Sequence, residues 1–98
     1  MSSAFDVPSF ECSNCVIENF TAEENDVVFS LSVPPYSSAK LRFIGVEDMT
    51  AGIEIIHQKI FCIRSRRLDN EKIEYEIQFC DSNVDEVHII AKSKRYSE

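Results

Sequence analysis

Apolar and polar residues alternate along most of the chain, which is the pattern of half-buried β-strands. The clearest case is residues 60–80, where two alternating runs flank the turn signal Asp69-Asn70. This arrangement predicts a β-hairpin. A three-residue loop of Asp69, Asn70 and Glu71, with Asn70 in a left-handed conformation, would set its register.

That register gives the hairpin one apolar face and one charged face. The predicted cross-strand neighbours are Leu68 with Lys72, Arg66 with Glu74, Arg64 with Glu76, Ile63 with Ile77, and Phe61 with Phe79. Each pair of opposite charges contributes a few tenths to ~1 kcal/mol. A slip of one residue would turn the charges into the core, so we expect a firmly fixed register.

Four further segments alternate in the same way and are joined by short polar turns: residues 15–20, 26–33, 40–46 and 86–93. The first two predict a second hairpin with a loop of about five residues. Gly45, near the end of the third segment, indicates a bulge or a close backbone approach. The last five residues form a polar tail.

Residues 47–60 are ambiguous. Their apolar side chains fall at helical spacing: Met49, Ile53, Ile56 and Ile60. Gly52 interrupts that pattern, however, and Ile53-Glu54-Ile55 alternates as a strand does. The favoured interpretation is a strand from Ile53, and a short helix or helical turn near 48–52 is the alternative. At most one short helix is expected near 48–58.

The predicted fold is one mainly β domain covering residues 1–98. It is a twisted antiparallel β-meander of about six strands, with residues 1–11 as a docking arm or a partly disordered segment. A single sheet must cover its apolar face. It can curl toward a barrel, use the arm, or pack against a second copy, so a homodimer is one of the open alternatives.

The net charge of −7 is unevenly placed. Residues 1–54 carry nine acidic residues against Lys40 and Arg42, whereas residues 55–98 carry equal numbers of acids and bases. This balance argues against nucleic-acid binding, which needs basic residues to neutralise phosphates. No apolar run is long enough for a membrane span, and the N-terminus does not resemble a signal peptide, so a cytoplasmic location is expected.

An acidic half suits a basic protein partner that is reached by electrostatic steering. The alternative is a solvated surface that only keeps the protein soluble. The candidate binding residues are Glu18, Glu23, Glu24, Asp26, Glu47 and Asp48.

Candidate chemistry is sparse. Cys12-Ser13-Asn14-Cys15 is a C-x-x-C motif, but a structural zinc site needs four ligands and no second pair accompanies it. Reduced thiols are therefore favoured over a metal site, Cys12 and Cys15 being the ligands if one exists, and no cofactor is expected. His57 and His88 lack a recognisable nucleophile or phosphate-binding motif nearby, so an enzyme is disfavoured.

Part of the chain resembles a group of small bacterial β-rich proteins, the predicted immunity proteins of toxin systems of the Imm50-like type. The matching residues are Cys15, Ile17, Phe20, residues 27–33, Leu41, Phe43, Gly45 and Val46. The resemblance implies a mainly β fold that binds and neutralises a toxin, and it transfers no catalytic residue.

The expected function is therefore that of a non-enzymatic protein-binding module with an acidic surface. One alternative is a small ligand-binding or enzymatic β-barrel. Another is a metal-binding module that uses Cys12 and Cys15.

Overall fold

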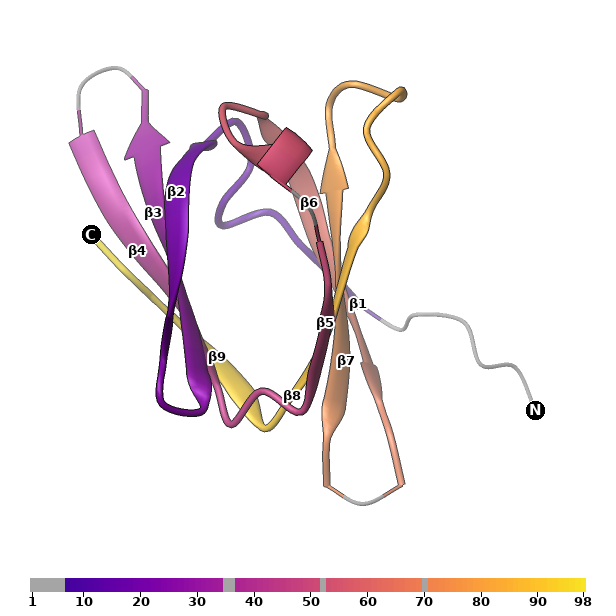
Figure 1. The fold of residues 1–98 in the computed structure, drawn as a ribbon. Helices are drawn as coiled ribbons and strands as arrows, with labels where there is room; N and C mark the ends of the chain where they lie inside the picture. The colour runs from indigo at the N-terminus through magenta and orange to yellow at the C-terminus, as the bar shows by residue number, and fades with distance from the viewer. Residues whose placement is uncertain (1–6, 35–36, 52, 70) are drawn as a thin grey trace.

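The computed structural model describes residues 7–34, 37–51, 53–69 and 71–98. They form nine strands and one 3-10 helix (Figure 1). The elements are β1 Val7–Ser9, β2 Val16–Glu23, β3 Asp26–Val33, β4 Ser37–Ile44, β5 Asp48–Thr50, η1 Ile53–Ile55, β6 Ile60–Arg67, β7 Ile73–Phe79, β8 Val87–Ala91 and β9 Ser93–Ser97. Within these ranges, no helix has the length and apolar character needed to cross a membrane.

The strands form two antiparallel sheets that face each other (Figure 1). One sheet has the order β1-β6-β7-β8-β5, and the other has the order β2-β3-β4-β9. The prediction of a mainly β, twisted antiparallel fold is confirmed. The described strands do not close into a barrel, and the apolar faces of the two sheets cover each other instead.

Aromatic side chains connect the two sheets across the core. Phe20, Phe29 and Phe43 follow one another across the four-stranded sheet, with ring centroids 5.4 Å and 5.7 Å apart. Phe43 then meets Tyr75 of β7 at 5.2 Å in an edge-to-face contact. Such contacts add about 0.5–1.5 kcal/mol each beyond the burial of apolar area.

Besides the passage from β1 into β2, two segments of the chain pass from one sheet to the other, β4 into β5 and β8 into β9. They bend side by side, and the Lys92 amide donates to the Ile44 carbonyl at 2.8 Å. Gly45 takes a φ of +65° at this bend, which glycine adopts without steric cost. The predicted bulge or close approach at Gly45 is confirmed.

The β6–β7 hairpin has the predicted register over most of its length. Arg66 lies opposite Glu74, Arg64 opposite Glu76, and Leu68 donates to the Lys72 carbonyl at 2.8 Å. In the described part of this turn, Glu71 has the left-handed conformation, with a φ of +62°. The prediction for Asn70 lies outside the described residues.

The predicted pairing of Phe61 with Phe79 is wrong. A bulge between Ile60 and Cys62 puts Ile60 opposite Phe79 and leaves Phe61 half exposed. Phe61 packs edge-to-face against Phe10 with ring centroids 6.0 Å apart. The bulge therefore keeps Ile60 in the core and turns Phe61 toward the N-terminal segment.

Several predicted boundaries also need correction. β2 continues to Glu23, so the loop to β3 has two residues, and Glu24 takes a φ of +56° there. The favoured strand from Ile53 is wrong, because residues 53–55 form η1, although the expectation of one short helix near 48–58 is confirmed. In η1, Ile55 is buried while Ile53 is 84% exposed, which a 3-10 turn allows.

Both ends of the described chain contribute strands that the alternation did not predict. The arm supplies β1, which pairs with β6 at the edge of the five-stranded sheet. The polar tail supplies β9, which pairs with β4. Together with β5, these strands account for the difference between the six predicted strands and the nine described.

Candidate functional site

The β2–β3 turn and the β4–β5 bend meet at one end of the molecule. The Val46 amide donates to the Asn25 carbonyl at 2.6 Å, and the Gly45 amide donates to Asp26 Oδ1 at 3.0 Å. These bonds join segments that are about twenty residues apart in the sequence. They bring together five of the six predicted binding residues, which we call the acidic end: Glu23, Glu24, Asp26, Glu47 and Asp48.

Ion pairs compensate part of the charge at the acidic end. Arg42 contacts Asp26 at 2.8 Å and Glu23 at 3.0 Å, and Lys72 contacts Glu47 at 3.5 Å. The hydrogen bond from the Gly45 amide, together with the Arg42 guanidinium, holds the pKa of Asp26 below its ordinary value. Asp26 in turn raises the pKa of Arg42, so this pair stays charged at neutral pH.

A negative excess remains at this end. Glu24 and Asp48 are exposed and have no ion-pair partner among the residues that the structure describes. Lys92 lies beside Glu47 and Lys72 in a small surface depression, and Arg95 lies opposite Arg42 in the β4–β9 ladder. Glu24 and Asp48 are thus the two carboxylates of the acidic end without an ion pair among the described residues.

Glu18, the sixth predicted binding residue, lies apart from the acidic end. It precedes Glu23 by five positions on β2, which corresponds to roughly 16 Å along a strand. Its side chain borders a depression of about 420 Å³ on the four-stranded sheet, together with Ser30, Lys40 and Glu98. The structure therefore does not place Glu18 in the same surface as the other five.

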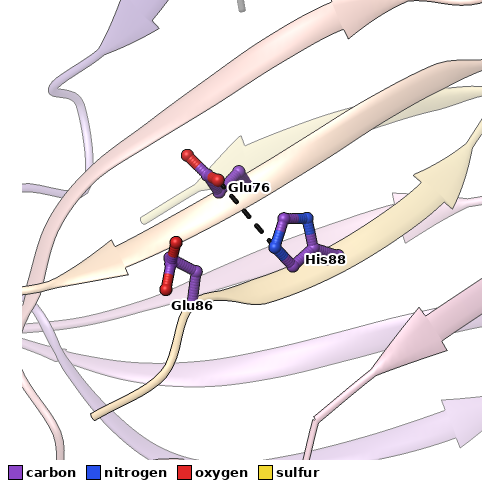
Figure 2. Close-up of side chains that lie close together, drawn as sticks. All are labelled: Glu76, Glu86 and His88. Carbon is purple, nitrogen blue, oxygen red and sulfur yellow. Dashed lines mark ion pairs between the residues drawn. The ribbon is translucent and has the colours of Figure 1, made fainter. Parts of the chain in front are cut away.

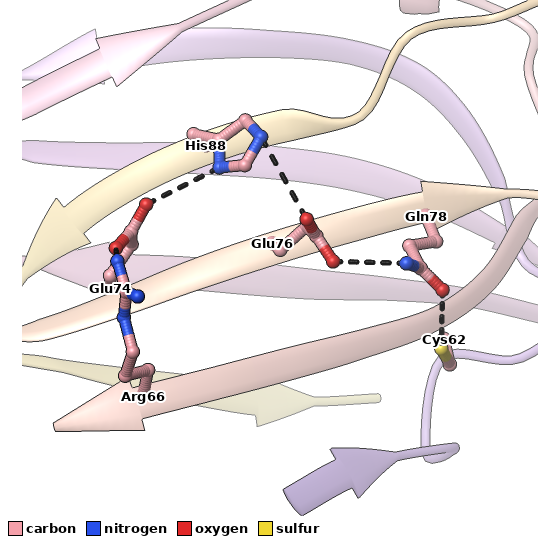
Figure 3. Close-up of polar contacts among 6 residues, drawn as sticks. All are labelled: Cys62, Arg66, Glu74, Glu76, Gln78 and His88. Atoms are coloured by element: carbon pink, nitrogen blue, oxygen red, sulfur yellow. Dashed lines mark hydrogen bonds and ion pairs between the residues drawn. The ribbon is translucent and has the colours of Figure 1, made fainter. Parts of the chain in front are cut away.

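The outer face of the five-stranded sheet carries a chain of polar contacts (Figure 3). At one end Arg66 pairs with Glu74, and Glu74 Oε2 lies 3.4 Å from His88 Nδ1. His88 Nε2 lies 3.8 Å from Glu76 Oε2. Gln78 Nε2 donates to Glu76 Oε1 at 2.9 Å, and Gln78 Oε1 accepts from the Cys62 thiol at 3.4 Å.

Glu76 occupies the centre of this chain and is only 7% exposed. Glutamate is rarely buried without partners, because its charge must be compensated. Glu86, just before β8, brings a second carboxylate beside it (Figure 2). One ligand atom from each of Glu76, Glu86 and His88 lies within 4.8 Å of the other two.

The sequence pattern alone does not predict this group, because it pairs Glu76 with Arg64 and gives His88 no acidic cross-strand neighbour. A signal was present in Glu86-x-His88, since residues two apart on a strand share one face. Recognising the group also required the β7–β8 register, which places His88 opposite Glu76.

The C-x-x-C thiols lie in the core. Cys12 and Cys15 are each 1% exposed, and burial, together with the neighbouring Cys15, raises the pKa of Cys12 to about 12. Burial also raises the pKa of Cys15. The described residues offer no third metal ligand beside these two thiols.

His57 lies apart from the polar chain, immediately beyond η1. It is exposed, and its amide donates to the Ile17 carbonyl at 2.6 Å with a φ of +71° at this position. Among the described residues, no carboxylate forms an ion pair with it. The structure thus joins His88, but not His57, to acidic side chains.

Comparisons with protein-family models, with curated proteins and with solved structures find no match to this chain.

Proposed function

We propose that this protein is a non-enzymatic binding module whose acidic end docks on a basic protein partner. The observation that carries the proposal is the pair of hydrogen bonds that fixes the β2–β3 turn against the β4–β5 bend. One joins the Val46 amide to the Asn25 carbonyl, and the other joins the Gly45 amide to the Asp26 carboxylate. Because these contacts hold the acidic side chains on fixed backbone, a partner meets a preorganised negative surface. The resemblance to toxin-immunity proteins supports the same class of function, in which the partner is a toxin that the module occludes.

Glu24 and Asp48 are the residues that most directly test the proposal. They are exposed and lack ion-pair partners within the described residues, so neutralising them removes charge without breaking a contact that holds the fold. The matched control is the double variant Glu54→Gln/Asp85→Asn, which removes two other exposed acidic charges elsewhere.

The experiment begins with capture of partners from the source cell by the wild type, by Glu24→Gln/Asp48→Asn and by the control. The association rate of the recovered partner is then measured over a range of salt concentrations. We expect the wild type and the control to associate rapidly at low salt and more slowly as salt rises. Glu24→Gln/Asp48→Asn should associate several-fold more slowly at low salt and converge with the wild type at high salt.

Two results would count against the proposal. One is that every captured protein binds the wild type and Glu24→Gln/Asp48→Asn equally well. The other is an association rate that does not change with salt.

A further inference from the structure

We infer that Glu76, Glu86 and His88 form a binding site for a divalent first-row transition metal ion on the outer face of the five-stranded sheet. Imidazole nitrogen and carboxylate oxygen together suit Zn²⁺ and its neighbours in the series, whereas Mg²⁺ and Ca²⁺ prefer oxygen ligands alone. The three side chains approach one another from β7 and from the start of β8 (Figure 2).

The separation of the ligand atoms fits a shared metal better than a direct bond. His88 Nε2 and Glu76 Oε2 are 3.8 Å apart, beyond the range of a hydrogen bond. Two ligands that each bind one zinc ion at about 2.1 Å lie roughly 3–4 Å from each other in a tetrahedral arrangement. A metal between them would therefore need little movement of either side chain.

The charges on the β8 side of Glu76 also favour a cation. On the β6 side, Arg64 lies opposite Glu76 in the ladder. On the β8 side, the approaching group is a second carboxylate, Glu86, within 4.8 Å of the first. Two carboxylates at this distance repel each other, and a bound divalent cation converts the repulsion into attraction.

Two neighbouring residues already contact the atoms of His88 and Glu76 that would not face the metal. Glu74 Oε2 lies 3.4 Å from His88 Nδ1, the ring nitrogen that would not face the metal. Gln78 donates at 2.9 Å to Glu76 Oε1, which leaves Glu76 Oε2 directed at His88 (Figure 3). Metal-binding histidines and carboxylates are commonly oriented by such outer partners.

Three protein ligands leave a coordination position open to water or to a further ligand. His88 has 39% of its side chain exposed and Glu86 is exposed, so an ion can reach the site from solvent. This site is independent of the acidic end, and its test does not require the protein partner.

The test is calorimetric titration of the full chain, stripped of metals, with ZnCl₂. We expect one zinc ion per chain for the wild type and for His57→Gln, the matched histidine control. His88→Gln and Glu86→Gln should each weaken zinc binding by at least about tenfold. Loss of a residue that only orients a ligand already lowers metal affinity by about tenfold or more, so loss of a ligand itself should cost at least as much. Because Glu86 is exposed in a loop and its carboxylate repels that of Glu76, Glu86→Gln should not lower the metal-free melting temperature.

The exposed thiol of Cys80 is a competing zinc ligand, so the titration is repeated with Cys80→Ser. Binding that survives Cys80→Ser and falls in both ligand variants supports the site. When Co²⁺ is bound in place of Zn²⁺, its absorption spectrum should show no sulfur-to-metal band, because no thiolate is a ligand of the proposed site. The inference is overturned if millimolar zinc does not bind, if Cys80→Ser abolishes binding, or if His88→Gln and Glu86→Gln bind like the wild type.

Discussion

Glu71 holds a backbone conformation that its side chain disfavours. Its φ of +62° is left-handed, and this is the third position of a three-residue hairpin loop, where glycine is common. Left-handed backbone costs a residue with a Cβ atom about 1–2 kcal/mol, and the greater freedom of unfolded glycine offsets about half of that. The turn therefore contains backbone strain at Glu71 that a glycine would relieve.

We predict that Glu71→Gly stabilises the protein by about 0.5–1 kcal/mol, the difference between these two effects. Urea unfolding of the wild type, Glu71→Gly and Glu71→Ala would measure it. Glu71→Ala controls for the loss of the carboxylate and should give no such gain. A Glu71→Gly protein that is no more stable than Glu71→Ala would contradict the prediction.

For individual residues, the pattern of charges predicted the cross-strand partners well, and the pattern of apolar residues predicted them less well. Arg66 and Glu74 pair as expected, because a slip of one residue would have buried charges. Phe61 did not pair as expected, because an apolar residue is acceptable on either side of a bulge. Its neighbour Phe10 lies about fifty positions earlier, and nothing in the local pattern specifies that contact.

The β2–β3 turn and the β4–β5 bend are connected chiefly through Asp26. Its carboxylate accepts from the Gly45 amide and from Arg42, so one side chain joins three segments of the chain. The pKa of Asp26 lies below its ordinary value of 3.8, hence the ionised form stabilises the fold above that pH. This contribution is lost as the pH falls through the lowered pKa.

Asp26→Asn should accordingly lower the melting temperature at neutral pH. The difference in melting temperature between the wild type and the variant should become smaller as the pH falls from about 5 to about 2, because wild-type Asp26 itself becomes protonated. Thermal denaturation at a series of pH values checks this, with Asp85→Asn, an exposed acid elsewhere, as the control. A difference that stays constant over this range would show that the charge of Asp26 does not matter.

Elements with strong alternation were predictable, and elements defined by their partners were not. The six alternating segments all became strands, since burial of one face decides their conformation. β9 contains Lys94 and Arg95 and has little apolar pattern, so only its pairing with β4 makes it a strand. η1 was ambiguous, because the chain reverses there and one isoleucine, Ile55, is buried without regular periodicity.

Gly45 matters to the whole molecule because the chain bends there from one sheet into the other. A Cβ atom at this position would lie 2.9 Å from Lys92 Cγ and Cδ, and the φ of +65° disfavours any side chain. The contact with Lys92 can relax, since a lysine side chain is flexible, but the backbone conformation cannot.

We therefore predict that Gly45→Ala destabilises the fold by about 0.5–1 kcal/mol through the left-handed backbone, with a smaller addition from the contact with Lys92. Gly45→Ala/Lys92→Ala should recover only the part that comes from the side-chain contact, and Lys92→Ala alone serves as the reference. Chemical denaturation followed by circular dichroism measures all three. Full recovery in the double variant would assign the cost to the contact rather than to the backbone.

The candidate sites depend on relations that only the assembled molecule shows. The six acidic residues were visible in the sequence, but their division into five at one end and Glu18 elsewhere follows from the sheet topology. The group of Glu76, Glu86 and His88 needed the β7–β8 register, and no charge pattern between those strands specified it.

The distribution of the four thiols has a practical consequence for labelling chemistry. Cys12, Cys15 and Cys62 are buried, while Cys80 is exposed immediately after β7. A maleimide dye applied to the native protein should therefore attach first at Cys80, without any engineered cysteine. That position follows β7, the strand that carries Glu76, so the dye would report on the polar face of the sheet from close by.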